Sequence, residues 1–142
     1  MQTATFALGC FWGPDDYFSK LKGVIKTRVG YSGGTKKNPS YYDLGDHTET
    51  VEITFDLKII SFEELLKHFW KEHDPTEQQV TQYKSAIFYQ NDEQKKLAEK
   101  SKKEVEQKLG RKVATEILKA GTFHQAEEYH QKYLQKGKGR VC

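Results

Sequence analysis

The residue of this sequence best suited to chemistry is Cys10, which lies in the segment GCFWG at positions 9–13. Before it, positions 3–8 alternate small or polar with apolar side chains, as a strand does, and after it a proline and two carboxylates are typical of the first turn of a helix. The positive end of that helix dipole would favour the thiolate, whereas Asp15 and Asp16 would oppose this effect. The pattern indicates either a reactive thiol beside two aromatic rings or a cysteine that packs as a small apolar side chain.

Glu49 is the candidate for an acid. In the predicted strand 50–56, the odd positions hold Val51, Ile53 and Phe55, and the even positions are more polar. If the strand extends back by one residue, alternation places the Glu49 side chain on the apolar side. Burial there would raise the pKa of its carboxyl and keep it protonated near neutral pH, which is the property of a general acid. The alternative is an ordinary glutamate at the exit of a loop.

Tyrosine is frequent, with eight residues in 142. Several tyrosines fall in or beside predicted loops, namely Tyr31, Tyr41, Tyr42 and Tyr83. Such side chains either line a pocket and offer hydroxyl donors or cover the edge of the core. The sequence leaves both alternatives open.

The second cysteine, Cys142, is the last residue, and the segment at about 135–142 contains two glycines and few apolar side chains. We expect this segment to be a flexible tail. A cysteine on such a tail can reach a distant thiol, which indicates a nucleophilic and a resolving cysteine that form a disulfide after oxidation. The alternative is a terminal thiol with no role.

Length and composition exclude several classes of protein. The 142 residues suffice for one domain with a core of its own. Only 3 of the 23 basic residues are arginine, which argues against nucleic-acid binding. Two cysteines without neighbouring histidines argue against a metal site, and no apolar run is long enough to span a membrane. Because the N-terminus shows no leader pattern, we expect a cytoplasmic protein, and with no sign of an obligate interface we expect a monomer.

The pattern of apolar residues predicts an α+β protein. We expect strands at 3–8, 24–31, 50–56, 84–89 and 113–119, and helices at 11–21, 61–72, 91–109 and 124–134. Ser61 and Glu64 predict a capping box at the second helix, and Gly110 predicts the end of the third. The order β-α-β-β-α-β, followed by α-β-α, predicts a two-layer sandwich with a ferredoxin-like (split βαβ) core and C-terminal additions.

One signature and seven supporting segments resemble the A-type peptide methionine sulfoxide reductases over nearly the whole chain. The signature is GCFWG at 9–13. The supporting segments are RVGYSGG at 28–34, NPSY at 38–41, HTE at 47–49, VEITFD at 51–56, HDPT at 73–76, TQYKSAI at 81–87 and AEEYHQKYL at 126–134. A five-residue motif alone would be moderate evidence, but the number and order of the segments make a chance match implausible.

This resemblance implies a single catalytic domain over residues 1–142 that reduces the S epimer of methionine sulfoxide, free or in proteins, to methionine. Cys10 would attack the sulfoxide sulfur, and Glu49 would protonate the sulfoxide oxygen. Tyr41 and Tyr83 would hydrogen-bond that oxygen. These roles suit the chemistry, because a sulfoxide sulfur is a poor electrophile until its oxygen is protonated or strongly hydrogen-bonded.

The resemblance also implies how the enzyme would be regenerated. The first step would leave a sulfenic acid on Cys10, and Cys142 would condense with it to a disulfide. Thioredoxin, or another dithiol, would then restore both thiols. No metal or organic cofactor is implied.

The substrate pocket is where this sequence departs from the family. By resemblance, Phe11 and Trp12 would form the apolar pocket for the methyl group of the substrate. Gln78 falls where the family has an aspartate that organises this pocket, and the loop around 77–80 is shorter than usual. Asp15 stands where the family usually has glutamate. None of these departures touches the nucleophile or the acid.

Two other functions would use the same residues. A thiol peroxidase or redox sensor would form the Cys10 sulfenic acid from peroxide, but it would have no evident use for an acid at Glu49. A domain that binds methionine-containing peptides without catalysis would have no use for the two cysteines.

Overall fold

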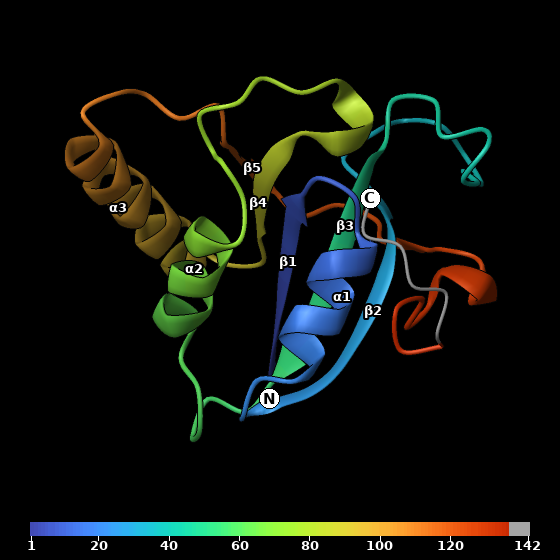
Figure 1. Cartoon of the computed structure of the whole chain (residues 1–142), viewed down its shortest axis with the longest axis horizontal. Helices are drawn as coiled ribbons and strands as arrows, with labels where there is room; N and C mark the ends of the chain where they lie inside the picture. The colour runs from blue at the N-terminus through green and yellow to red at the C-terminus, as the bar shows by residue number, and fades with distance from the viewer. Residues whose placement is uncertain (137–142) are drawn as a thin grey trace.

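The computed structural model describes residues 1–136. Their elements are, in order, β1 (Gln2–Leu8), α1 (Trp12–Ser19), β2 (Val24–Ser32), β3 (Thr48–Phe55), α2 (Phe62–Lys71), the 3-10 turn η1 (Thr81–Tyr83), β4 (Ser85–Tyr89), α3 (Asp92–Leu109), β5 (Glu116–Lys119), β6 (His124–Gln125) and the 3-10 turn η2 (Glu128–His130). Figure 1 shows α1 and α2 in front of the central strands and α3 beside α2. The predicted α+β class is confirmed.

The strands form one six-stranded sheet in the order β5-β4-β1-β3-β2-β6. Neighbouring strands are antiparallel except for the pair β4–β5, which is parallel. Helix α1 connects β1 to β2, with β3 between these two strands, and α2 connects β3 to β4, with β1 between them. Each βαβ unit therefore encloses a strand of the other, which is a split βαβ arrangement. Helix α3 provides the crossover that a parallel pair such as β4–β5 requires.

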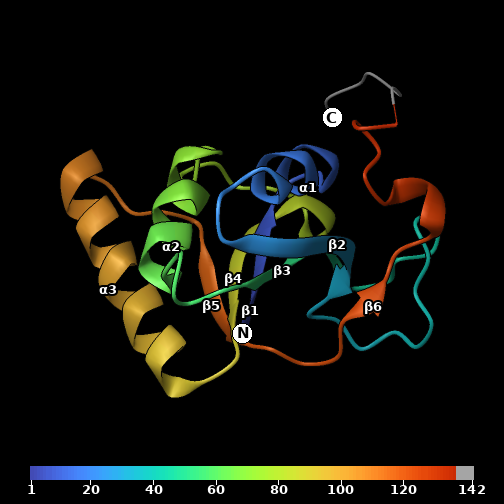
Figure 2. The same ribbon diagram turned by 90° about the horizontal axis from the view of Figure 1, so that it is seen from below.

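Figure 2 shows α1 and α2 on one face of the sheet. Aromatic side chains fill the layer between the sheet and these two helices. Phe6 of β1 packs on Phe18 of α1, with ring centroids 5.8 Å apart. It also packs on Phe62 and Phe69 of α2, at 6.0 and 5.0 Å. Because strand side chains alternate between faces, Ala7 points to the other side of the sheet, where a smaller apolar cluster forms.

Local end signals predict several element boundaries correctly. The Ser61 hydroxyl accepts the backbone N–H of Glu64 (3.1 Å) at the start of α2, as the capping box predicts. Gly110 has a φ of +70° and ends α3 in the left-handed conformation. The strand predicted at 113–119 is shorter and begins at Glu116.

The predicted helix at 124–134 is wrong. Its first two residues pair with β2 as strand β6, and only residues 128–130 form a single 3-10 turn. The Gln131 side chain then bonds both backbone groups of Val29 in β2. These contacts with β2 outweigh the helix propensity of the segment, which is a weak determinant by itself.

Helix α3 is the most exposed of the three helices. Of its 18 residues, Gln94 and Ala98 are buried, and most of the others are charged or polar and face solvent. Over residues 1–136, none of the helices, α3 included, has the length and apolar character needed to cross a membrane.

Candidate active site

Cys10 lies in the turn between β1 and α1. Strand β1 ends at Leu8, and Gly9 has a φ of +94°, a conformation that favours glycine over other residues. Phe11 is the N-cap residue of α1, and Cys10, which precedes it, is half-buried. The predicted strand–helix junction is therefore present, and it places the cysteine near the positive end of the helix dipole.

Glu49 lies in β3 opposite Tyr31 of β2, and its side chain is fully buried. Its Oε1 accepts the backbone N–H of Phe11 (3.2 Å), and its Oε2 accepts the side-chain amide of Gln82 (2.6 Å). Burial raises the pKa of this carboxyl, although the hydrogen bonds from Gln82 and Phe11 oppose the shift. The fold thus brings a protonatable carboxyl to the residue that follows Cys10.

Two of the four candidate tyrosines meet beside this carboxyl. The hydroxyls of Tyr41 and Tyr83 are hydrogen-bonded, and burial, together with the charges of Tyr83 and Glu49, raises the pKa of Tyr41 to about 12. The Tyr41 hydroxyl therefore keeps its proton at neutral pH and can donate a hydrogen bond. In contrast, Tyr42 is 87% exposed, and Tyr31 is buried within β2.

In a second carboxyl group, that of Glu127, the pKa is shifted in the opposite direction. Its Oε1 accepts the Tyr31 hydroxyl (2.7 Å), and its Oε2 accepts the backbone N–H of Tyr41 (3.1 Å). Burial alone would raise the pKa of Glu127, but hydrogen bonds from its own backbone and from the two tyrosines lower it overall. The site thus contains one carboxyl that favours the proton and one that favours the charge.

Aromatic rings form a wall beside the turn. Phe11 is buried, with its ring centroid 5.2 Å from that of His130. Trp12 donates its Nε1–H to His130 Nδ1 (3.0 Å) and stacks on Tyr133, with centroids 3.7 Å apart. Because His130 Nδ1 accepts this bond, the proton of the neutral imidazole lies on Nε2. Burial lowers the pKa of His130 and keeps the ring neutral, so Phe11 and Trp12 lie against an uncharged surface.

Both carboxylates at the start of α1 have cationic partners. Asp15 is buried and forms an ion pair with Lys132 (3.0 Å), whereas Asp16 pairs with Lys20 on the helix surface (3.0 Å). Each negative charge is therefore offset by a positive one. The predicted opposition of these carboxylates to the helix dipole at Cys10 is correspondingly weaker than their presence in the sequence implies.

Gln78 is exposed in the loop between α2 and η1. The glutamine that reaches Glu49 is Gln82, four positions later, because η1 turns it toward β3. A role for Gln78 in substrate binding stays a prediction. Cys142 lies outside the described residues, as do residues 137–142 of the predicted tail.

Four residues of this region are not predicted by reasoning from the residues alone, namely Gln82, Glu127, His130 and Lys132. All four fall within segments that resemble the reductase family, at 81–87 and 126–134. That overlap is the one sequence signal that could have singled them out. Neither hydrophobic periodicity nor spacing marks them, because their partners are distant in the chain.

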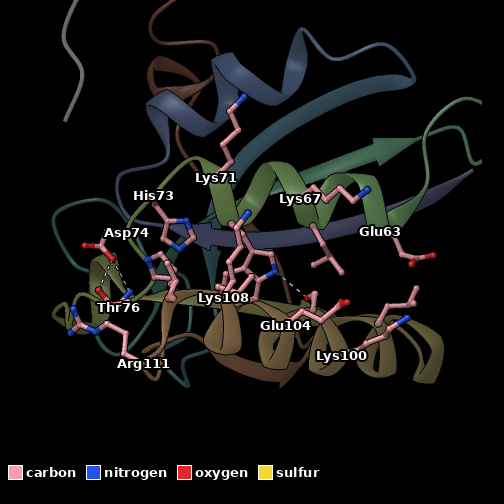
Figure 3. Close-up of a pocket in the computed structure, with 17 residues that line it drawn as sticks. Glu63, Lys67, Lys71, His73, Asp74, Thr76, Lys100, Glu104, Lys108 and Arg111 are labelled. Atoms are coloured by element: carbon pink, nitrogen blue, oxygen red, sulfur yellow. Dashed lines mark hydrogen bonds between the residues drawn. The ribbon is translucent and has the colours of Figure 1, made fainter.

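A cavity of about 840 Å³ lies between α2 and α3, and none of the predicted site residues lines it. Figure 3 shows that lysines and glutamates from both helices surround it, among them Lys67 and Glu104. Among residues 1–136, no cluster of three or more His, Cys, Asp or Glu side chains could hold a metal ion. The chemistry predicted from the sequence is therefore concentrated at the turn that carries Cys10.

Comparison with known proteins decides among the functions that this geometry allows. The family model described as peptide methionine sulfoxide reductase matches residues 2–142. The chain belongs to this family. The predicted resemblance and the predicted enzyme class, a peptide methionine sulfoxide reductase, are thereby confirmed.

Related proteins match the chain over most of its length. The peptide methionine sulfoxide reductase MsrA of Methanococcoides burtonii is 47% identical over 148 residues, which cover 96% of this chain and 97% of that protein. Mxr1 from Saccharomyces cerevisiae in reduced form has a TM-score of 0.93 at 32% identity, covering 99% of this chain and 88% of that one. Mxr1 in complex with Trx2 has a TM-score of 0.71 at 28% identity, covering 93% of this chain and 84% of that one. The fold of the reductases is therefore shared by this chain.

Proposed function

We propose that this protein reduces methionine-S-sulfoxide, free or in proteins, to methionine, with Cys10 as the nucleophile. The observation that supports this most is the buried Glu49 carboxyl, which accepts the backbone N–H of Phe11, the residue after Cys10. A sulfoxide sulfur reacts with a thiolate only when its oxygen is protonated or strongly hydrogen-bonded. A carboxyl whose pKa is raised by burial is the acid that this step requires.

In this proposal the tyrosines hold the sulfoxide oxygen. Tyr41 has a pKa of about 12 and stays protonated, and its hydroxyl is paired with that of Tyr83. Hydroxyl donors in a buried site stabilise charge on the oxygen as it leaves sulfur. Glu127 binds the backbone N–H of Tyr41 and so holds the loop that carries it.

The methyl group of the substrate would lie against Phe11 and Trp12. Both rings belong to the start of α1, directly after Cys10. The proposed methyl pocket and the proposed nucleophile are therefore adjacent in the chain. The hydrogen bond from Trp12 to His130 fixes the orientation of the indole ring. An apolar wall on one side and hydroxyl donors on the other suit a group with a methyl and an oxygen on the same sulfur.

The first step transfers the sulfoxide oxygen from the substrate sulfur to the Cys10 sulfur. The Cys10 thiolate bonds to the sulfoxide sulfur while Glu49 protonates the sulfoxide oxygen. The hydroxyl then passes to the Cys10 sulfur as the substrate's S–O bond and the new sulfur–sulfur bond both break, which leaves methionine and a sulfenic acid on Cys10. We assign Cys142 to the second step, in which its thiol displaces the sulfenic oxygen as water and forms a disulfide. The Mxr1–Trx2 complex supports thioredoxin as the reductant of this disulfide. A cycle driven by thioredoxin suits a reducing compartment, for which we propose the cytoplasm.

The deciding experiment is a turnover assay on separated S and R epimers of methionine sulfoxide, with thioredoxin as the reductant. We expect turnover of the S epimer alone, its loss in Cys10→Ser, and one methionine per enzyme without thioredoxin-dependent cycling in Cys142→Ser. Preference for the R epimer, or persistent reduction by Cys10→Ser, would refute the proposal. Turnover of hydrogen peroxide in place of either epimer would support a thiol peroxidase instead.

A further inference from the structure

The cavity between α2 and α3 is a groove with apolar walls. Its volume of about 840 Å³ lies in the range of pockets that bind small molecules. Helix α2 contributes Leu66 and Trp70, and α3 contributes Leu97, Val105 and Leu109. The three α3 residues are eight and four positions apart, so they lie on one face of that helix. We name this cavity the α2–α3 groove.

Hydrogen bonds within the protein fix the shape of the groove. The indole N–H of Trp70 donates to the Ser101 hydroxyl (3.0 Å) and joins the two helices. Residues 73–76 line one end of the groove (Figure 3). The Pro75 carbonyl accepts the backbone N–H of Ala114 (2.6 Å), which attaches this end to the chain after α3. The groove is therefore formed before any ligand binds, as most small-molecule sites are.

The rim of the groove carries more positive than negative charge. Its cations are Lys67, Lys71, Lys100, Lys108 and Arg111, and its carboxylates are Glu63, Asp74 and Glu104. Asp74 already accepts the backbone N–H and the hydroxyl of Thr76 (2.9 and 2.6 Å). Among residues 1–136, none of the four lysine ammonium groups takes part in an ion pair or a hydrogen bond. These four donors are therefore available to a ligand of opposite charge.

We propose that the α2–α3 groove binds an amphipathic organic anion, a molecule with an elongated apolar body and a carboxylate head. The apolar walls bind the body by the hydrophobic effect, and the lysines donate charged hydrogen bonds to the head. From Leu97 to Leu109 the α3 wall extends for about 18 Å, by the rise of an α-helix. This length suits an extended chain rather than a compact inorganic ion.

The proposed ligand site is separate from the proposed reductase site. None of the residues to which we assign a role in sulfoxide reduction lines the groove. The inference therefore does not rest on the proposed function, and loss of reductase activity would leave it unaffected. Binding is the quantity to measure, not turnover.

The test uses the two tryptophans of the full-length protein as reporters, since Trp70 lines the groove and Trp12 lies beside Cys10. Decanoate, kept below the concentration at which it forms micelles, is titrated into the reduced, ¹⁵N-labelled protein. Trp70→Phe assigns the two indole N–H signals. We expect the Trp70 signal to shift saturably and the Trp12 signal to stay in place. Decyltrimethylammonium has a chain of the same kind with a cationic head, and it should bind about tenfold more weakly or worse.

Charge reversal tests the contact between the carboxylate and the lysines. For the double variant Lys100→Glu with Lys108→Glu we expect decanoate to bind about threefold more weakly or worse, from the strength of two exposed ion pairs. The matched control is Lys96→Glu with Lys103→Glu, which makes the same change of charge at exposed positions of α3 outside the groove. It should bind decanoate with wild-type affinity.

Four outcomes would overturn the inference. They are the absence of a saturable Trp70 shift, a shift of Trp12 alone, equal affinity for the cationic probe, and equal weakening in the two double variants. A Trp70 signal that moves with protein concentration without ligand would also overturn it, because a second copy of the chain would then cover the groove. If the α3 variant does not fold, Lys67→Glu with Lys71→Glu makes the same change on α2.

Discussion

Glu49 is joined to the turn of Cys10 by one hydrogen bond, in which the backbone N–H of Phe11 donates to its buried carboxyl over 3.2 Å. The two residues are 38 positions apart and belong to different elements, β3 and the start of α1. The bond matters because it holds the Glu49 carboxyl at the N-terminal end of the helix that follows Cys10. Movement of β3 relative to α1 would break this bond and move the Glu49 carboxyl away from the turn.

Replacement of Glu49 by Gln tests its role as an acid. The amide oxygen of Gln can still accept the Phe11 N–H, but the side chain can no longer supply a proton. We expect methionine formation in a single turnover to slow by about 10²-fold or more, the usual contribution of a general acid. Glu52→Gln is the control, because Glu52 lies in the same strand on the opposite face and pairs with Arg28. A rate near that of wild type for Glu49→Gln would show that another group supplies the proton.

The pH dependence of the same step gives a second test. Burial raises the pKa of Glu49 above its ordinary value of 4.5, and the acid is active only while protonated. The rate of methionine formation should therefore decline as the pH rises through this raised pKa, in a pH series of single turnovers. Glu49→Gln should lack this decline. An identical decline in both proteins would assign it to a different group.

From the buried state of His73 we predict that the free energy of unfolding is lower at mildly acidic pH. Its Nδ1–H donates to the carbonyl of Phe69 (2.8 Å), so its Nε2 accepts the hydroxyl proton of Ser85 (2.7 Å). Burial lowers the pKa of His73 below 6.5, although the Phe69 carbonyl and the charge of Asp74 oppose the shift. Between the two pKa values the unfolded chain binds more protons than the folded one. The free energy of unfolding is therefore at its maximum above pH 6.5 and decreases as the pH falls toward the folded pKa.

Urea unfolding at pH 7.5 and pH 5.5 measures this effect. The slope can reach about 1.4 kcal/mol per pH unit for one histidine. His73→Gln should reduce the difference between the two pH values, and a remainder is expected because burial also lowers the pKa of His130. If the free energy of unfolding of His73→Gln differed between the two pH values as much as that of the wild type, the pH dependence could not be assigned to His73.

Gly30→Ala tests the attachment of β6 to β2. A methyl group at this position would overlap the carbonyl oxygen of His124 and would approach the Phe123 ring to within 2.6 Å. We expect the free energy of unfolding to fall by about 1–3 kcal/mol, as for other cases of overpacking. Gly13→Ala is the control, since among the described residues no atom lies within 4 Å of the added group apart from those of its chain neighbours and its own helix backbone, and alanine favours a helix. Equal free energies of unfolding for Gly30→Ala and wild type would mean that β6 moves to accommodate the methyl group without loss of stability.

Some features of this protein follow from the sequence because they depend on neighbours within a few positions. The turn at Cys10 has a glycine on one side and helix-start residues on the other, and the structure places it between β1 and α1. The strand alternation that predicts burial of Glu49 is likewise local, and the side chain is fully buried. The caps at Ser61 and Gly110 obey the same short-range rules.

Other features were decided only by tertiary structure. Gln82 bonds Glu49 across 33 positions, and Lys132 bonds Asp15 across 117. Such partners meet because the strand order β4-β1-β3-β2-β6 places segments that are distant in the chain beside β3 and α1. The segment 124–134 was predicted as a helix for the same reason, since its helix propensity is local and its contacts with β2 are not. The sequence alone predicts Cys10 as the nucleophile and Glu49 as the acid, whereas the groups that hold these two residues in place depend on long-range packing, which local patterns do not encode.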